Sequence, residues 1–348
     1  MIDVGAPFLL LMAADSCYFR RASFGHVRQE EEVPLGRLVR AAALAVVIGS
    51  MTVAYTGGAS QAAVGASAEK SGPGRRRGPE LKSNVALVID AESGETLYAK
   101  HPAQVAPIAS ITKLMTAMVV LDAQSPLDET IEIDPADVDT RKHTRSRLPV
   151  GARLGRWELL LLSLMASENR AATALARTYP GGTAACLEAM NRKAKELGML
   201  WTRFTDPAGL SGENVSSAED LSRMVLAAIE YPAIREATTT SSHSLTLANG
   251  RVLQFQNTDG LVSNKTWKIG LSKTGYINEA GRCLVLHAEI QARQIVIVLL
   301  NSWGTYTRQG DANRIRKWME ATVPLPATGR EAIPNAEPAR ASGARSRP

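Results

Sequence analysis

Apolar side chains recur with a helical period along residues 107–123. They stand at i, i+3, i+4, i+7 and i+8, as Ile111, Leu114, Met115, Met118 and Val119. This spacing predicts a helix with a wide apolar face. Pro107 precedes the first of these positions, as proline often does where a chain enters a helix.

Other stretches show strand-like and helix-like patterns. Strands are predicted near both ends of the patterned region, at residues 84–98 as a hairpin and at 267–276, 282–290 and 294–301. Helices are predicted at residues 156–165, 184–198, 217–229 and 308–322. One more helix is predicted to start at Arg170. A further hairpin is expected at residues 244–256, turning at Asn249 and Gly250.

Strands at both ends with helices between them predict a mixed α/β (α+β) domain over residues 84–322. In this arrangement the N-terminal hairpin pairs with the C-terminal strands to form one sheet. The helices then cover the sheet, because their apolar faces need a surface to pack against.

The chain ahead of this domain has the pattern of a secretory signal. Arg37 and Arg40 precede an apolar run over residues 41–54, and small residues follow around Ala62. This order predicts a signal peptide over residues 33–62 and export to the periplasm. A membrane span needs about 20 apolar residues, so an uncleaved N-terminal anchor, with the membrane association it would give, is the less favoured alternative.

Three further segments lack the pattern of a folded domain. Residues 1–32 carry mixed charges without periodicity, and we expect the natural start to lie nearer Val33. Residues 63–83 are small, polar and basic, which predicts a flexible linker. Residues 323–348 are rich in proline, alanine and arginine, which predicts a disordered tail.

The charge of the chain matters mainly for what it excludes. The 348 residues carry a formal net charge of +6, but segments 1–81 and 323–348 hold most of this excess. The middle of the chain is nearly neutral, which does not support a nucleic-acid-binding surface. The sequence contains no His-Glu-x-x-His motif and few clustered ligands, so no metal or other cofactor is expected.

Two cysteines, Cys186 and Cys283, would remain after cleavage of the signal. Cys186 lies in a predicted helix and Cys283 in a predicted strand. An oxidising compartment would permit a disulfide bond between them. Two buried free thiols are the more ordinary arrangement, and this alternative is favoured.

Two polar residues interrupt the apolar helix at its start. Ser110 and Lys113 are three positions apart, so both side chains lie on one face. The N-terminus of a helix disfavours a cation, and burial on an apolar face also favours the neutral amine. A neutral lysine can take the proton of a serine hydroxyl and activate it as a nucleophile. The ordinary alternatives are that Ser110 is a helix N-cap and that the amine of Lys113 reaches water.

Two more polar groups interrupt apolar elements further along. Ser167 and Asn169 lie between two predicted buried helices, where a hydroxyl and an amide would be held rigidly. Lys273, Thr274 and Gly275 lie near the end of a predicted strand, where glycine would let a substrate backbone approach closely. Ordinary interpretations remain for each group, with Ser167 as an N-cap and Lys273 as a lysine on an exposed edge strand.

The order Ser-x-x-Lys at 110, Ser-x-Asn at 167 and Lys-Thr-Gly at 273 is more specific than any of these motifs alone. With it, the sequence resembles the low-molecular-mass penicillin-binding proteins, the D-alanyl-D-alanine carboxypeptidase and endopeptidase group of serine peptidases. The resemblance covers about residues 84–320, and residues 147–151 and 164–170 look most like the endopeptidase (penicillin-binding protein 7) branch. It implies a β-lactamase/transpeptidase-like fold, with an antiparallel sheet flanked by helices and an all-helical subregion.

The resemblance also implies catalytic roles. Ser110 would be the nucleophile that forms an acyl-enzyme with a D-alanyl carbonyl group. Lys113 would be its base, and Ser167 would relay a proton toward the leaving amine. The implied substrates are peptidoglycan stem peptides, and β-lactams are the implied covalent inhibitors.

A substrate-binding set follows from the same resemblance. Its members are Asn169, Lys273, Thr274, Gly275 and Tyr276. The backbone N–H groups of Ser110 and Tyr276 would form an oxyanion hole, where the loss of one donor typically raises the barrier by about 3–4 kcal/mol.

Three other functions are compatible with parts of this pattern. A D-alanyl-D-alanine carboxypeptidase shares all the motifs. A β-lactamase shares the trio, but no Glu-x-x-Leu-Asn segment that could supply a deacylating base lies between Asn169 and Lys273. A non-catalytic peptidoglycan-binding protein would not require Lys113 beside Ser110. Because the sequence looks most like the endopeptidase branch, the resemblance implies hydrolysis of D-alanyl cross-links, and this is the favoured prediction.

Overall fold

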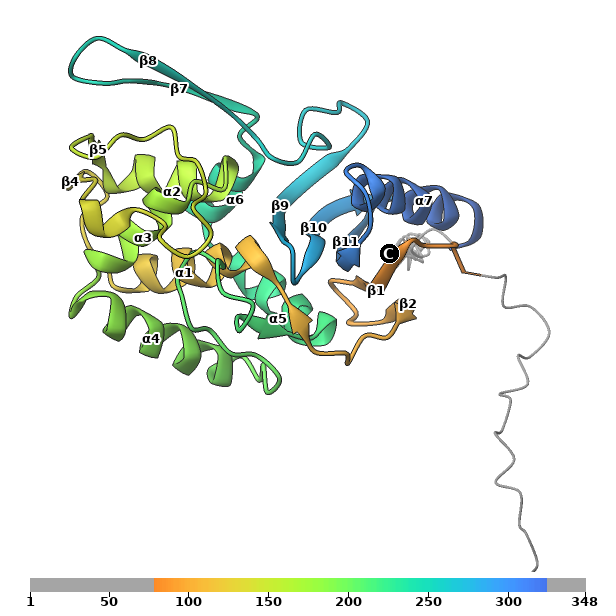
Figure 1. Ribbon diagram of the computed structural model, residues 1–348. Helices are drawn as coiled ribbons and strands as arrows, with labels where there is room; N and C mark the ends of the chain where they lie inside the picture. Colours follow the sequence, from red (N-terminus) through yellow and green to blue (C-terminus); the bar gives the residue numbers. More distant parts are fainter. Residues whose placement is uncertain (1–77, 324–348) are drawn as a thin grey trace, which may run out of the picture. The chain divides into compact units, whose positions relative to one another are not determined.

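The computed structural model describes residues 78–323. Its central element is a five-stranded antiparallel sheet with the strand order β2-β1-β11-β10-β9 (Figure 1). The strands are β1 (Ser83–Asp90), β2 (Thr96–Lys100), β9 (Lys268–Ile277), β10 (Gly281–Ile290) and β11 (Arg293–Ser302). The N-terminal hairpin pairs with the C-terminal strands, and this prediction is confirmed.

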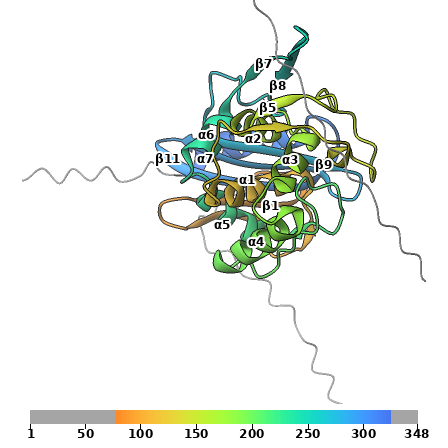
Figure 2. The same ribbon diagram turned by 90° about the vertical axis from the view of Figure 1, so that its left-hand side faces the viewer.

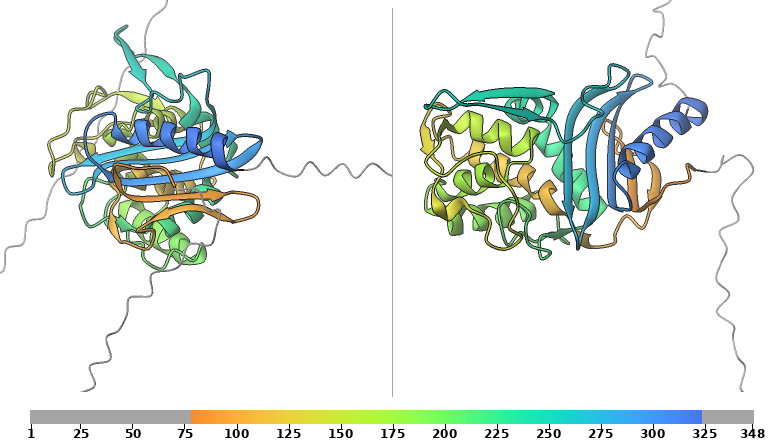
Figure 3. Two further views of the ribbon diagram at one scale, coloured as in Figure 1. Left: turned by 90° about the vertical axis from the view of Figure 1, so that its right-hand side faces the viewer. Right: turned by 45° about the horizontal axis from the view of Figure 1, so that its top comes forward.

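Both faces of the sheet are buried, because the apolar side chains of its central strands are almost continuous. In β1 the side chains of Val85 and Leu87 enter one hydrophobic core, and those of Ala86 and Val88 enter the other. Successive side chains of a strand point to opposite faces, so one run of sequence fills two cores. Helix α7 (Thr307–Thr322) covers one face, and a group of helices lies against the other (Figure 3).

This group of helices forms the all-helical subregion. Its members are α1 (Thr112–Asp122), α2 (Arg156–Met165), α3 (Asn169–Arg177), α4 (Gly182–Glu196), α5 (Ala218–Ala228) and α6 (Pro232–Thr239). Helix α1 contacts all the others and lies among them (Figure 2). Every residue of α1 from Thr112 to Val120 is buried, so the helix is enclosed on all sides rather than on one apolar face.

Several short elements connect the sheet and the helices. Strand β3 (Ala106–Pro107) pairs with β6 (Val215–Ser216), β4 (Thr130–Glu132) pairs with β5 (Arg153–Gly155), and two 3-10 turns cover Ala109–Ile111 and Pro135–Asp137. Strands β7 (Ser242–Thr246) and β8 (Val252–Gln256) form a separate hairpin that projects beside the helical region (Figure 1). Gly250 in its turn has a φ of +79°, which agrees with the predicted turn at this position.

Two helices differ from the sequence prediction. The helix expected over residues 107–123 begins as the 3-10 turn Ala109–Ile111 and becomes α-helical only at Thr112. Helix α6 was not predicted. It is eight residues long and its buried apolar side chains are Ile234 and Ala237, which is too short a run to reveal a helical period.

The expected upstream segment 1–32, the signal 33–62 and most of the linker and tail lie outside the described residues. The last residues of the expected linker are described. Leu81 is buried, and the N–H groups of Lys82 and Ser83 donate to Asp311 in α7, at 3.1 and 2.7 Å. The expected linker over 63–83 is therefore wrong at its last residues, because they pack against the fold. No helix between residues 78 and 323 is long and apolar enough to span a membrane.

Both cysteines of the described region are buried free thiols. Cys186 lies in α4 and Cys283 in β10, and burial raises their pKa values to about 12 and about 11. Of the two arrangements that the sequence allowed, this is the favoured one. A thiol with so high a pKa is mostly protonated and weakly nucleophilic at neutral pH.

Candidate active site

Ser110 lies in the 3-10 turn between β3 and α1, and two glycines let other backbone segments press against this turn. A Cβ atom on Gly209 would lie 2.0 Å from the carbonyl oxygen of Ala109, and one on Gly275 would lie 2.8 Å from that of Ile108. Ala109 itself has a φ of +48°, which is a strained value for alanine. The turn that carries Ser110 is thus held between the Gly209 loop and strand β9.

The Gly209 loop owes its shape to one buried carboxylate. The two oxygens of Asp206 accept hydrogen bonds from the backbone N–H groups of residues 208–211, at 2.6 to 3.1 Å. These bonds fold the backbone tightly around the carboxylate. As a result, the carbonyl oxygen of Ala208 points at the amine of Lys113, 2.6 Å away.

The amine of Lys113 is fully buried and touches three oxygen atoms. Its Nζ atom lies 2.8 Å from Ser110 Oγ, 2.7 Å from Asn169 Oδ1 and 2.6 Å from the carbonyl oxygen of Ala208. Burial lowers the pKa of Lys113 to about 7, although the negative charges of Asp206 and Glu168 partly oppose this shift. The alternative in which this lysine reaches water is wrong.

A neutral amine fits this arrangement atom by atom. It has two N–H groups, which can donate to the oxygens of Asn169 and Ala208, and one lone pair, which then faces the hydroxyl of Ser110. The hydroxyl can therefore donate its proton to Nζ. This geometry allows the amine to act as a general base toward Ser110.

A second lysine–serine pair lies across the groove. Lys273 in β9 is 1% exposed, and its Nζ donates to Ser167 Oγ at 3.0 Å and to the carbonyl oxygen of Thr274 at 2.9 Å. Burial, with the positive charges of Lys113 and Arg308, lowers the pKa of Lys273 well below its ordinary value. The alternative of a solvated lysine on an edge strand is wrong, even though β9 is at the edge of the sheet.

Ser167 is not a helix N-cap. Glu168 occupies the N-cap position of α3, and no side chain caps the helix there. Ser167 instead has a φ of +58° in the link between α2 and α3. A left-handed serine is uncommon and is often found at functional sites. This conformation lets the link turn its hydroxyl toward Lys273.

These residues meet at one groove. A cavity of about 260 Å³ is lined by Ser110, Ser167, Asn169, Thr258, Thr274, Gly275, Tyr276 and Arg308. Lys113 and Lys273 lie beneath it and contact the two serines. The structure thus brings together all eight residues that the sequence singled out. Within residues 78–323, no cluster of His, Cys, Asp or Glu side chains could hold a metal ion.

Comparisons with known proteins identify the family of the chain. The family model described as D-alanyl-D-alanine carboxypeptidase matches residues 73–304. The chain belongs to this family. Among curated relatives, the D-alanyl-D-alanine endopeptidase of Pseudomonas aeruginosa is 48% identical over 242 residues, which cover 69% of this chain and 78% of the relative. The D-alanyl-D-alanine endopeptidase of Escherichia coli is 45% identical over 252 residues, which cover 72% and 81%.

Solved structures of the D-alanyl-D-alanine carboxypeptidase group have the same fold. The Streptomyces K15 DD-transpeptidase superposes with a TM-score of 0.66 at 27% identity, over 71% of this chain and all of that one. A D-alanyl-D-alanine carboxypeptidase from Mycobacterium tuberculosis gives 0.66 at 29% identity, over 72% and 96%. The predicted fold class is therefore confirmed.

This family member has a groove residue that the sequence did not reveal, Arg308 in the first turn of α7. Arg308 is 8% exposed, and its Nε and Nη1 atoms have no hydrogen-bond partner among the described residues. Burial lowers its pKa, while the charge of Asp259 opposes the shift. The sequence does contain one signal for Arg308. A cation in the first turn of a helix is disfavoured, and the same reasoning pointed to Lys113.

Two hydroxyl groups were also missed. Thr258 Oγ1 lies 2.6 Å from Thr274 Oγ1 and lines the groove. Thr144 Oγ1 accepts a hydrogen bond from Asn169 Nδ2 at 2.8 Å. This bond orients the amide so that its oxygen faces Lys113. Neither threonine lies near a motif in the sequence, so no local pattern could identify them.

The contact at Gly209 predicts how the site responds to substitution. Gly209→Ala is expected to destabilise the protein by several kcal/mol, because a methyl group would overlap the backbone of Ala109. Gly250→Ala is the matched control: its φ is +79°, close to the +77° of Gly209, but it faces open space. It should cost only the strain of the backbone, about 1–2 kcal/mol. Urea unfolding of both variants measures the difference, and equal losses would contradict the tight contact.

Proposed function

We propose that this chain is a serine DD-peptidase that hydrolyses D-alanyl bonds in peptidoglycan through an acyl-enzyme on Ser110. One observation carries the proposal: the hydroxyl of Ser110 touches the buried amine of Lys113, whose pKa of about 7 leaves much of it neutral at physiological pH. An exposed lysine would be almost fully protonated there. Membership of the family supports the same function.

The first step converts one amide bond into an ester. Lys113 accepts the hydroxyl proton of Ser110 while Oγ bonds to the D-alanyl carbonyl carbon, forming a tetrahedral intermediate. The C–N bond then breaks. The leaving nitrogen takes up the proton that Lys113 had accepted, and Ser167 relays this proton. The 3.0 Å contact between Lys273 and Ser167 supports this role by holding the relay hydroxyl in place. Water then hydrolyses the ester, which releases the new carboxylate and restores Ser110.

The carbonyl oxygen of the substrate would lie between the backbone N–H groups of Ser110 and Tyr276. The position of Gly275 supports this oxyanion hole, because a Cβ atom there would lie 3.1 Å from Ser110 N. Strand β9 therefore passes directly beside the nucleophile. Donors fixed in this way stabilise the developing charge without having to rearrange during the reaction.

The leaving-group end of the groove is proposed to hold a carboxylate. Thr274 and Arg308 line the groove there, and the buried amine of Lys273 donates to the carbonyl oxygen of Thr274. The guanidinium of Arg308 has two nitrogens without hydrogen-bond partners among the described residues. A carboxylate adjacent to the scissile nitrogen is common to a terminal D-alanine and to a D-centre in a cross-link. A planar guanidinium binds such a group well. Asn169 and Thr274 would bind the peptide backbone.

The cross-link is the proposed site of cleavage. Two curated relatives at 48% and 45% identity are named endopeptidases, which favours this activity over removal of a terminal D-alanine. Peptidoglycan lies outside the cytoplasm, so we propose that the signal over residues 33–62 exports the chain to the periplasm. β-Lactams would acylate Ser110. Membrane association through an uncleaved signal stays a prediction.

Covalent labelling tests the nucleophile. The full chain is expected to form a stable adduct with fluorescent penicillin, and Ser110→Ala is expected to form none, because the hydroxyl that attacks the β-lactam is gone. Ser263→Ala removes an exposed hydroxyl that does not line the groove. This control variant should label like the wild type. Gel fluorescence and intact mass report the adduct. Equal labelling of Ser110→Ala and the wild type would exclude Ser110 as the nucleophile.

Product analysis tests the bond that is cut. Purified protein should convert cross-linked muropeptide dimers into monomers, because the proposed scissile bond joins two stem peptides. Mass spectrometry of the digest separates this outcome from its alternative. If pentapeptides become shorter by one residue while dimers persist, the chain is a carboxypeptidase.

A further inference from the structure

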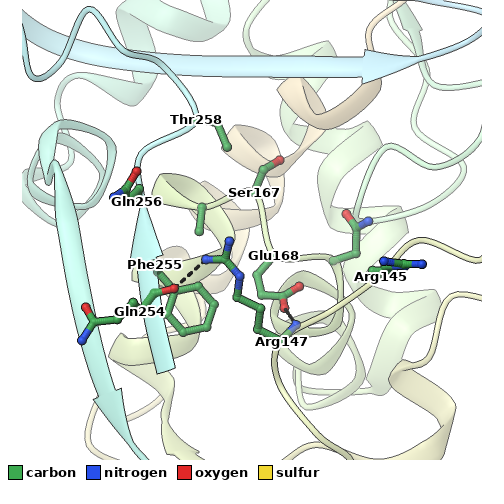
Figure 4. Close-up of a pocket in the computed structure, with 10 residues that line it drawn as sticks. Arg145, Arg147, Ser167, Glu168, Gln254, Phe255, Gln256 and Thr258 are labelled. Atoms are coloured by element: carbon green, nitrogen blue, oxygen red, sulfur yellow. Dashed lines mark hydrogen bonds between the residues drawn. The ribbon is translucent and has the colours of Figure 1, made fainter. Parts of the chain in front are cut away.

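The two ends of the groove differ in how open they are. The leaving-group end, at Arg308, continues into a cavity of about 480 Å³ beside Arg147, whose rim includes Ser167 and Thr258 (Figure 4). The opposite end lies beyond Tyr276, where strand β9 passes into its turn to β10. Because the leaving group takes the first end, the acyl donor of the substrate runs toward the second, which we call the donor end.

One ion pair crosses the groove at the donor end. The ammonium group of Lys142 donates a hydrogen bond to the carboxylate of Glu279. Lys142 lies in the loop between residues 138 and 147, on the helical side of the groove, and Glu279 lies in the turn between β9 and β10, on the sheet side. The bond from Lys142 lowers the pKa of Glu279, so this carboxylate is ionised at neutral pH. The pair therefore joins the two walls of the groove.

The loop that carries Lys142 is fastened to the groove wall. The carboxylate of Asp139 accepts hydrogen bonds from the backbone N–H groups of residues 141, 142 and 144, at 2.9 to 3.0 Å. Thr144 Oγ1 in turn accepts the bond from Asn169 Nδ2 at 2.8 Å. The ammonium group of Lys142 takes no part in these bonds, so the loop can keep its shape without that group.

Glu279 is supported from the other side. A Cβ atom on Gly212 would lie 3.4 Å from the Cβ and Cγ atoms of Glu279, so the stem of this side chain packs on the loop that begins at Gly209. The side chains of Lys142 and Glu279 are nevertheless 31% and 46% exposed. Their attraction is therefore modest and is weakened by salt.

The position of the ion pair decides which acyl donors meet it. Glu279 is three residues after Tyr276, which places it no more than about 11 Å along the chain from the proposed oxyanion hole. A donor that carries one short group beyond its carbonyl ends before this distance. A donor of three or more peptide residues spans about 10 Å when it is extended. Such a donor cannot lie along β9 without meeting the ion pair.

We propose that Lys142 and Glu279 are specificity-determining residues that narrow the donor end of the groove, so that a long acyl donor must separate them and a short one need not. The inference rests on the proposed function, because it needs an acyl donor bound at Ser110. Separating an exposed ion pair costs little. The pair therefore slows acylation by long donors without excluding them.

Two penicillins with the same β-lactam nucleus test this role. One is benzylpenicillin, and the other carries a neutral side chain of three amino-acid residues. Lys142→Met removes the charge and keeps most of the side-chain length. It should raise the acylation rate constant for the extended penicillin by about 2- to 5-fold, the range for an exposed ion pair, and should leave that for benzylpenicillin unchanged. Intact mass spectrometry over time measures both rate constants.

Charge reversal provides the sharpest control. Lys142→Glu faces Glu279 with a like charge and should act as Lys142→Met does, while Lys142→Glu combined with Glu279→Lys restores the attraction and should return the wild-type ratio of the two rate constants. Glu289→Gln breaks a similar exposed pair, between Lys268 and Glu289 at 2.7 Å, away from the groove. This variant should keep the wild-type ratio.

Salt gives a test that needs no substitution. Raising NaCl from about 0.05 M to about 0.5 M screens exposed charges. It should speed acylation of the wild type by the extended penicillin, and should have no such effect on Lys142→Met.

The outcomes separate this inference from the proposed function. An equal change for both penicillins in Lys142→Met, no change for the extended one, or a double variant that behaves like Lys142→Glu would overturn the role of the ion pair alone. Circular dichroism checks that each variant is folded, and Glu279→Gln removes the other charge as a second variant. A wild type that benzylpenicillin does not acylate at Ser110 would overturn the proposed function as well.

Discussion

The contact between one buried amine and one hydroxyl sets the requirements for the rest of the structure. Lys113 can accept a proton from Ser110 only if water is kept from its Nζ atom, and α1 meets this condition because it is enclosed by the other helices. Desolvation of an ammonium group is costly, so the amine remains neutral over much of the physiological pH range. The oxygens of Asn169 and Ala208 then satisfy its two N–H groups.

The fold supplies this contact from segments that lie far apart in the chain. The helical region contributes Ser110, Lys113 and Ser167, and the sheet contributes Lys273 through strand β9. The two parts meet at Gly275, where the absence of a side chain lets the backbone of β9 lie against the turn that carries Ser110. Helix α7 lies on the opposite face of the sheet but sends Arg308 to the end of the groove. A rigid scaffold on both sides keeps the reacting groups in a productive geometry.

Features that depend on a local pattern of residues were predicted from the sequence, and features that depend on packing between distant segments were missed. The sheet, most of the helices and the Ser110–Lys113 pair follow from periodicity and i, i+3 spacing. The start of α1 was wrong because a 3-10 turn and an α-helix share the same apolar pattern over one turn. Arg308 and Thr258 were missed because their role depends on packing between distant segments. A local stretch of sequence does not show which segments pack together. The cavity beside Arg147 likewise exists only because residues 145–148 meet a hairpin more than 100 residues later.

The direct measurement is the titration of Lys113 itself. Protein labelled with 13C at the lysine ε position gives one NMR signal for each ordered lysine, and the signal missing from Lys113→Met identifies this one. We expect its chemical shift to titrate with a midpoint near pH 7, since burial lowers the pKa of Lys113 to about 7. A midpoint near 10.5, the ordinary value for lysine, would contradict a neutral amine at Ser110.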